Sequence, residues 1–483
     1  MDANKTHEIR TFRAFSSRNY RLYFTGQSVS LIGTWMQKTA VSWVIYTLTH
    51  STFLLGVTLF ASLFPSFLFS LIGGVVSDRY NRYKVLLTTQ IASLIQALLL
   101  AILILLKHYA VWEIISLSVV LGIINAFDVP ARQSLVYEMV EDKNDLPNAL
   151  ALNSSMVNLS RIVGPALAGI VLEAFGDGMC FLLNALSFVA VIASLLMMKL
   201  PAYIKKEHTK NVLGELKEGM AYIKRTPSIA FVLVMLALIS LMVLPFSTLI
   251  PYYAKDVFKG TASTFGVIDS FIGLGAFSGA IFLASVKAGT NLKQILFINT
   301  LVFGVGLILF SHEHSYPLAL AFVTIAGFGM MSQITVSNTL IQTTVSPDMR
   351  GRVISYYAMA FFGMQPLGGL LVGAVSKWVG TQDTLLFEGI AALLIGMLHW
   401  RYLHKEKMKE KAMAIETQRL EVVLLSGFYI WLLFRPACRL RPCHIHVCRR
   451  PANKHHRHLL CGRLPPVHRS NNACPPHDPY QNV

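Results

Sequence analysis

Long apolar stretches separated by short polar segments dominate the sequence. Each has about the 20 residues that a helix needs to cross a bilayer. Twelve can be drawn, near residues 22–48, 54–76, 85–106, 111–131, 148–172, 179–199, 228–253, 263–286, 293–311, 317–339, 353–376 and 384–403. The pattern predicts an all-α membrane protein with twelve transmembrane helices. The first stretch is too long for a cleavable signal peptide and has no small-residue cleavage site, so we expect it to be retained.

The longest polar connection divides the twelve stretches into two sets of six. It covers residues 201–227, is rich in lysine and contains a predicted amphipathic helix at 212–223. Two equal sets are typical of a duplicated transporter. We therefore predict an N-terminal six-helix bundle (1–200), a cytoplasmic linker (201–227) and a C-terminal six-helix bundle (228–411). The segments after the fourth and tenth stretches, 131–140 and 336–345, occupy equivalent places in this repeat.

The composition agrees with a membrane protein and excludes a soluble enzyme. Hydrophobic residues make up 54% of the chain, and the charged fraction is 14%, against about a quarter in soluble domains. A soluble fold cannot cover that much apolar surface. The sequence has no catalytic constellation and no Walker-type phosphate loop, so we expect a non-enzyme that ATP does not drive directly and that has no cofactor and no metal.

The formal charge of +17 is compatible with a nucleic-acid partner or with a membrane surface. The short loops favour the membrane. If the N-terminus is cytoplasmic, the inner segments hold 26 lysines and arginines and the outer loops four, which are Lys107, Lys255, Lys259 and Lys377. By the positive-inside rule, both termini face the cytoplasm. We expect a multi-pass protein of the cytoplasmic (inner) membrane with no nucleic-acid partner.

Residues 74–84, Gly-Val-Val-Ser-Asp-Arg-Tyr-Asn-Arg-Tyr-Lys, resemble the loop signature of the major facilitator superfamily. Asn81 replaces its usual Gly, and Tyr83 replaces a frequent basic residue. Further stretches resemble the efflux and secretion-effector branch, the group of enterobactin exporters and macrolide efflux proteins: residues 19–27, 30–37, 128–133, 158–165 and 347–353. The resemblance covers roughly residues 12–405. It implies two bundles that alternate between inward-open and outward-open states, driven by an ion gradient, commonly of protons.

The resemblance assigns a gating role to the loop after the second helix. In the family this loop stabilises the outward-facing state. The residues of this chain that match it are Gly74, Asp78, Arg79 and Arg82. Asp78 is expected to face a helix N-terminus of the other half, where the helix dipole favours an anion. Gly74 is expected to let two helix ends approach closely. The alternative is that the basic residues only set the orientation.

Proline and glycine interrupt two predicted helices. Gly164, Pro165 and Gly169 lie in the fifth, and Pro366 lies in the eleventh. Proline removes a helix hydrogen bond and bends the helix, and glycine permits close packing. We expect helix bends at these residues, although small residues and proline are common in membrane helices in general.

Polar residues recur at helical spacing on three predicted helices, so each set shares one helix face. The sets are Gln27, Ser30, Thr34 and Lys38; Ser154, Asn158, Arg161 and Pro165; and Ser332, Thr335, Thr339 and Gln342. Such faces avoid lipid and line a cavity or another helix. Lys38 and Arg161 lie near mid-span, where a charge faces water or a partner. They favour an anionic substrate group, unless they pair with Asp128 or a backbone carbonyl.

Few acidic residues lie inside the predicted helices. Asp128, Asp269 and Glu388 are candidate proton carriers, because desolvation can neutralise an intramembrane carboxylate. Each could instead be an interfacial residue. Ser118 stands where related antiporters have a membrane-embedded arginine, which argues against proton coupling at that position.

The tail, residues 412–483, differs from the rest of the chain. It holds five of the six cysteines and seven of the fifteen histidines. Cys443, His444, His446 and Cys448 resemble metal ligands, but their spacing is not that of a paired zinc site. We expect a disordered extension, with a metal-binding tail as the alternative.

Together these features predict a monomeric secondary transporter in the lipid bilayer. It would export a small amphipathic molecule by alternating access and proton antiport. A siderophore-like or other anionic metabolite is the leading substrate class, and a drug is the second. A lysophospholipid flippase and a non-transporting membrane sensor or assembly factor on the same fold remain alternatives.

Overall fold

The computed structural model describes residues 12–107, 109–200, 212–287 and 289–433. Within these ranges the secondary structure is helical, with no strand, which confirms the all-α class. The chain forms two compact units, Met1–Lys411 and Ala412–Val483. The first unit contains all the sites discussed below.

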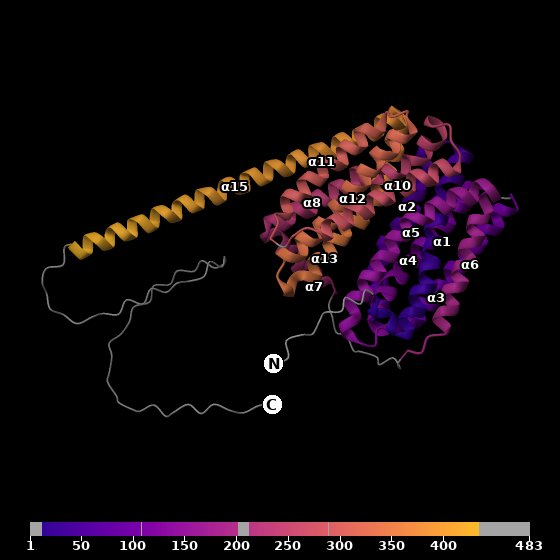
Figure 1. Cartoon of the computed structure of the whole chain (residues 1–483), viewed down its shortest axis with the longest axis horizontal. Coiled ribbons are helices and arrows are strands. Elements are labelled where there is room, and N and C mark those ends of the chain that lie inside the picture. The colour runs from indigo at the N-terminus through magenta and orange to yellow at the C-terminus, as the bar shows by residue number, and fades with distance from the viewer. Residues whose placement is uncertain (1–11, 108, 201–211, 288, 434–483) are drawn as a thin grey trace, which may run out of the picture. The chain divides into compact units, whose positions relative to one another are not determined.

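The first half of this unit contains six long helices that coincide with the first six apolar stretches (Figure 1). They are α1 (Arg18–Thr49), α2 (Thr52–Arg79), α3 (Arg82–Leu105), α4 (Val111–Met139), α5 (Leu146–Phe175) and α6 (Asp177–Leu196). Side-chain caps start two of them. Ser51 accepts a hydrogen bond from the Leu54 amide before α2, and Asn81 accepts from Tyr83 and Lys84 before α3. Such caps satisfy amides that the helix itself leaves unpaired.

The helix predicted between the halves is present as α7 (Val212–Arg225). It packs against α13 (Arg350–Ala358) of the second half. The Tyr356 hydroxyl donates to the Leu216 carbonyl at 2.9 Å, and Arg352 forms an ion pair with Glu218. Residues 201–211 of the predicted linker lie outside the described residues.

The second half repeats the plan with interrupted helices. Its elements are α8 (Pro227–Met242), α9 (Ile250–Tyr252), α10 (Ala262–Ala284), α11 (Leu292–Ser311), α12 (Tyr316–Thr344), α13, α14 (Met364–Val379) and α15 (Thr381–Leu433). Pro245 and Pro251 accompany the change from α8 through a 3₁₀ turn, Leu244–Leu249, into α9. A π-helical turn, Met359–Gly363, separates α13 from α14.

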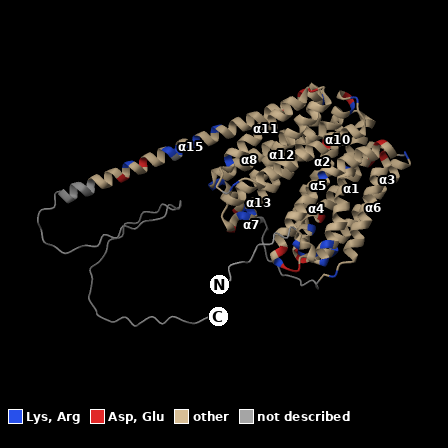
Figure 2. Cartoon of the chain, in the orientation of Figure 1, with Lys and Arg blue, Asp and Glu red and all other residues tan. Residues whose placement is uncertain are grey.

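Eleven helical segments in the described part of the chain are long and apolar enough to cross a membrane. They coincide with the predicted stretches from the second to the twelfth. The first, α1, has 32 residues and is long enough, but its polar stripe and Lys38 make it less apolar than the others. Figure 2 shows the charged residues of the first unit mainly near the helix ends and few between them, as is expected in a bilayer.

The helices turn their apolar side chains outward. On α11, Ile298, Val305 and Leu309 are exposed, whereas Asn299 and Thr300 are buried. This arrangement is the reverse of a soluble protein and is expected where lipid surrounds the molecule. Polar groups inside are paired with one another: the Thr300 hydroxyl donates to Gln333 at 2.7 Å.

Candidate substrate site

The two mid-membrane cations meet on one tryptophan. The Lys38 ammonium nitrogen lies 4.6 Å, and the Arg161 guanidinium carbon 5.2 Å, from the centre of the Trp35 ring. Trp35 precedes Lys38 by three residues on α1, so both lie on one face of that helix. Gly164 allows α5 to approach α1 here, because a Cβ at this position would lie 2.5 Å from the Trp35 Cβ. The ring thereby holds both cations by cation–π attraction.

Arg161 has hydrogen-bond donors that the protein does not fully use. Its Nη1 lies 3.9 Å from the sulfur of Met331 on α12, a weak acceptor. Its Nε is buried and has no hydrogen-bond partner among the described residues. A buried donor without an acceptor is costly, so this guanidinium is suited to a ligand that supplies anionic oxygens. Lys38 is solvent-exposed although it lies near mid-span.

A carboxylate from the second half faces these cations. Asp269 on α10 accepts a hydrogen bond from the Thr39 hydroxyl at 3.2 Å. It acts electrostatically on both Lys38 and Arg161. None of the ion pairs among the described residues joins Asp269 to either cation. The cluster of Trp35, Lys38, Arg161 and Asp269, which we name the charge cluster, therefore combines both halves.

The other predicted cavity residues have different environments. On α1, Gln27 is buried, at 2% exposure, and Thr34 is half-buried and donates to the Ser30 carbonyl. On α5, Asn158 is half-buried and donates to the Ser154 carbonyl at 2.9 Å. On α12, Thr335 is half-buried, whereas Thr339 and Gln342 are exposed. The exposed residues Thr339 and Gln342 lie toward the end of the molecule that is named the split end below.

At one end of the molecule, hydrogen bonds connect the two halves. Tyr46 on α1 donates to Asp256, and the hydroxyls of Thr52 on α2 and Ser376 on α14 are 2.6 Å apart. Thr261, before α10, donates to Glu173 on α5 at 3.0 Å. We name this end, marked by these three pairs, the closed end.

Glycine crossings bring the two halves together at the closed end. A Cβ on Gly56 of α2 would lie 2.3 Å from the Gly369 carbonyl oxygen of α14. A Cβ on Gly266 of α10 would lie 2.3 Å from the Pro165 oxygen and 3.0 Å from the Gly169 Cα on α5. Such distances exclude any side chain, so backbone contacts backbone directly, as small residues permit in membrane helices.

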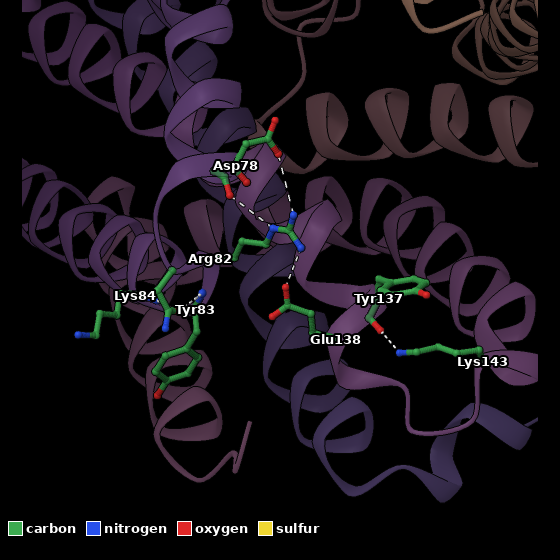
Figure 3. A network of polar contacts seen from close by, with 9 residues as sticks. Asp78, Arg82, Tyr83, Lys84, Tyr137, Glu138 and Lys143 are labelled. Atoms are coloured by element: carbon green, nitrogen blue, oxygen red, sulfur yellow. Dashed lines mark hydrogen bonds and ion pairs between the residues drawn. The ribbon is translucent and has the colours of Figure 1, made fainter. Parts of the chain in front are cut away.

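The opposite end holds the predicted gating loop, and there the described contacts of Arg82 are with residues of the first half (Figure 3). The Arg82 guanidinium contacts Glu138 on α4 at 2.7 Å and Asp78 at 4.0 Å. The Asp78 side chain is 60% exposed, and no described contact joins it to a helix N-terminus of the second half. Arg79 is exposed. We name this end, marked by Asp78 and Arg82, the split end.

Two details of the gating loop differ from the expectation. The close helix approach predicted for Gly74 occurs at Gly73, whose Cβ would lie 1.9 Å from the Ala126 carbonyl oxygen, whereas Gly74 faces open space. A helix turns by about 100° per residue, so the neighbouring residue faces another way. Asn81, which replaces the usual glycine, has a φ of −63° and caps α3, so its backbone does not require glycine.

The three candidate proton carriers have three different environments. Asp128 is buried and saturated: it accepts from Thr89 at 2.9 Å and Gln90 at 2.6 Å and lies 3.2 Å from Arg132. Asp269 belongs to the charge cluster. Glu388 on α15 is 3% exposed, and neither of its carboxyl oxygens has a hydrogen-bond partner among the described residues.

The predicted bend residues serve packing and helix ends. α5 remains one helix through Gly164, Pro165 and Gly169. Pro366 lies in the first turn of α14, directly after the π-helical turn, where its missing amide hydrogen costs little. Pro366 thus lies within a continuous helical run from Arg350 to Val379, in which the π-helical turn directly precedes α14.

Two side features lie apart from the site. His312 Nε2 is 3.4 Å from Asp383 at the start of α15, a contact that is an ion pair when the imidazole is protonated. The structure places residues 412–433 in α15. The cysteines and histidines of the tail prediction, from Cys438 onward, lie outside the described residues.

Sequence reasoning missed three contributors to the charge cluster. Trp35, Thr39 and Met331 are ordinary membrane-helix residues, and only the crossing of α1, α5, α10 and α12 brings them to the cations. The one available signal was local: Trp35 stands three residues before Lys38, the spacing of neighbours on a helix face.

Comparison with known proteins places this architecture in a family. Residues 9–425 match the family model for transmembrane secretion effectors. The staphyloferrin A transporter of Staphylococcus aureus is 25% identical over 393 residues, covering 80% of this chain and 97% of that protein. The enterobactin exporter EntS of Salmonella typhi is 24% identical, covering 78% and 91%. Macrolide efflux protein A of Streptococcus pyogenes is 22% identical, covering 79% and 96%.

Solved structures share the fold at lower sequence identity. The nucleoside transporter NupG superposes with a TM-score of 0.67 at 13% identity, covering 80% of this chain and 99% of its own. A bacterial homologue of the lysosomal transporter Spinster, in an inward-facing and unoccupied conformation, gives 0.64 at 12% identity, covering 80% and 96%.

Proposed function

The chain belongs to the transmembrane secretion effector family of the major facilitator superfamily, and from this premise we propose that it exports a small amphipathic molecule that carries an anionic group. The family and the relatives are membrane transporters, which confirms that the chain is a multi-pass transporter and not an enzyme. The substrate class, the coupling ion and the orientation belong to the proposal.

One observation carries the choice of an anionic group: two cations in mid-membrane converge on Trp35, and the Nε of Arg161 lacks an acceptor. An anion that entered would gain charge-assisted hydrogen bonds from the guanidinium and attraction from the ammonium. The Arg161 Nε is buried, so the low dielectric constant around it strengthens the contacts that this guanidinium would make.

The relatives support two substrate classes. The staphyloferrin A transporter and the enterobactin exporter favour a siderophore-like metabolite, and the macrolide efflux protein favours a drug. The charge cluster favours the first class for this chain. The cavity residues Thr335, Thr339 and Gln342 on α12 would complete the path on the second half. A lysophospholipid flippase also fits an anionic amphipathic substrate and is the second candidate.

The two ends of the molecule support alternating access. We propose twelve membrane spans, with α1 as the first, a monomer in the cytoplasmic membrane, and both termini in the cytoplasm. In that orientation the split end faces the cytoplasm and the closed end faces outward. Export would require the Tyr46–Asp256 and Thr52–Ser376 contacts to open while the Asp78 loop meets the other half.

Proton antiport is proposed with the carboxylates of the two halves as carriers. Asp128 is saturated by Thr89, Gln90 and Arg132, so it is the least suited to gain and lose a proton. Glu388 has no hydrogen-bond partner among the described residues and is the better candidate. A buried carboxyl without a partner is accommodated more easily in its neutral form.

The proposal is tested by export. Cells that lack the gene and cells that overproduce the protein are compared for metabolites retained inside, and staphyloferrin A, enterobactin and a macrolide are added as defined candidates. Arg161→Ala should reduce export at least about tenfold, as expected for loss of a desolvated charged contact, with unchanged protein in the membrane. Arg401→Ala, an exposed arginine on α15, is the matched control. Unchanged export by Arg161→Ala would remove Arg161 from the site.

A further inference from the structure

Two hydrogen bonds fix the register between Asp269 and the two cations. Thr39, next to Lys38 on α1, donates to Asp269 at 3.2 Å. Ser270, next to Asp269 on α10, donates to the carbonyl of Ile162, next to Arg161 on α5, at 2.8 Å. The carboxylate is therefore placed beside both cations by neighbours on three helices.

Close helix packing strengthens this placement. A Cβ on Gly273 of α10 would lie 3.0 Å from the Arg161 carbonyl oxygen, so α10 and α5 are in backbone contact at the level of the cluster. The cations and the carboxylate interact electrostatically, yet no ion pair joins them within the described part of the chain. Asp269 thus lowers the positive potential of the site without occupying the donors of Arg161.

We propose that Asp269 is a specificity-determining residue that leaves the charge cluster with one net positive charge, so that the exporter selects substrates bearing a single anionic group over those bearing two. This inference rests on the proposed anion site and deepens it. Two cations alone would favour a dianion. A fixed carboxylate from the opposite half cancels one of the two charges and repels the second charge of a dianion.

The test uses two aromatic probes that differ by one charge. Benzoate is a monoanion and phthalate a dianion at neutral pH, and their binding to the purified full-length protein in detergent is measured with radiolabelled ligand. Wild type should bind benzoate more tightly than phthalate. Asp269→Asn keeps the size of the side chain and an acceptor for Thr39. It should tighten benzoate binding by about fivefold and phthalate binding by about 25-fold, because each negative charge of the ligand loses its repulsion by the carboxylate.

Three further variants separate charge from structure. Asp269→Glu keeps the charge and should retain the wild-type preference for benzoate. Thr39→Val removes the hydrogen bond but keeps the carboxylate, and should retain most of the preference. Asp383→Asn, a carboxylate lost near His312 and far from the cluster along the chain, should leave both affinities unchanged. If Asp269 had only a structural role, its substitution would weaken the binding of both probes by the same factor and leave the ratio of their affinities unchanged.

The outcomes also separate the inference from the proposed function. If Arg161→Ala abolishes binding of both probes but Asp269→Asn leaves their ratio unchanged, the anion site stands and the role of Asp269 is overturned. If Arg161→Ala leaves both affinities unchanged, or if wild type binds neither probe, both the anion site and the inference are overturned. The inference is supported only if the ratio of the two affinities shifts towards phthalate in Asp269→Asn.

Discussion

The closed end and the split end differ in how the two six-helix halves contact each other. At the closed end, backbone meets backbone across glycines, and hydroxyl and carboxylate groups bond from one half to the other. At the split end, the described polar contacts are local: Arg82 pairs with Glu138 inside the first half, and Arg352 of the second half pairs with Glu218 on the linker helix α7. Polar groups are therefore present at both ends, and the hydrogen bonds described between the halves are those of the closed end.

The comparison shows which polar groups have partners that do not depend on the other half and which have partners across the interface. Arg82 has its partner Glu138 within the first half, and Arg352 has its partner Glu218 on α7, so these two ion pairs do not depend on contact between the halves. Tyr46, Thr52 and Glu173 at the closed end have their partners across the interface, so separation there breaks hydrogen bonds. The charge cluster lies between the closed end and the split end. There the Thr39 hydroxyl still donates a hydrogen bond to Asp269 across the two halves.

The largest effect is expected from a bulky residue at a closed-end crossing. Gly266→Leu places a side chain where even a Cβ would lie 2.3 Å from the Pro165 oxygen, so α5 and α10 must separate. We expect a destabilisation of about 3 kcal/mol, typical of overpacking, and loss of export. Thermal unfolding of the purified protein measures the first, and disulfide formation between Thr52→Cys and Ser376→Cys in a cysteine-free background reports whether the closed end still closes.

A glycine at the split end is the control for that substitution. A Cβ on Gly351 of α13 meets nothing within 4 Å, and alanine favours the helix by up to about 1 kcal/mol over glycine. Gly351→Ala should keep or slightly raise the unfolding temperature and leave the disulfide yield unchanged. If Gly266→Leu behaves like Gly351→Ala, the glycine crossing does not hold the closed end.

A smaller effect is expected from one hydrogen bond across the closed end. Tyr46→Phe removes the hydroxyl that donates to Asp256, a bond to a charged group worth about 1.5–3 kcal/mol. The equilibrium should shift away from the closed end by about tenfold, and the disulfide yield between positions 52 and 376 should fall.

The matched control for Tyr46→Phe lies within one half. The Tyr83 hydroxyl donates to the Leu195 carbonyl at 3.1 Å, from α3 to α6. Tyr83→Phe should lower the unfolding temperature but leave the disulfide yield at the closed end unchanged. An equal loss of yield in both variants would mean that the yield follows general stability rather than contact between the halves.

The helices, the repeated plan and the two cations were predictable from the sequence because they depend on local pattern. Apolar runs predict the long helices α1 to α6 and the membrane-crossing segments of the second half, and the spacing of polar residues placed Lys38 and Arg161 on faces that avoid lipid. The register between halves was not predictable. Whether Asp269 meets Lys38, or Gly73 rather than Gly74 meets α4, depends on how helices far apart in sequence are rotated and shifted against each other.

The sequence left open whether a polar face of a membrane helix lines a cavity or packs against another helix. Gln27 and Arg161 belong to the same kind of stripe, yet Gln27 is buried, at 2% exposure, whereas Arg161 reaches Met331 of the second half. A stripe shows only that a face avoids lipid. It does not distinguish packing within a bundle from the surface between bundles, because both exclude lipid equally.

The smallest effect is expected at the split end. Arg82→Gln removes the pair with Glu138, whose side chains are 27% and 32% exposed, and such partly solvated pairs contribute about 0.2–1 kcal/mol. The unfolding temperature should fall slightly in Arg82→Gln and by no more in Glu138→Gln, and the double variant should match Arg82→Gln, because both substitutions remove the pair with Glu138 whereas only Arg82→Gln also removes the contacts with Asp78 and the Ser77 carbonyl. The closed-end disulfide yield should stay level or rise slightly, because the Asp78 loop is expected to stabilise the opposite conformation, with the closed end open. A fall in that yield as large as in Tyr46→Phe would show that the two ends are held by one network, and would remove the distinction between an end that bonds across the halves and an end that bonds within them.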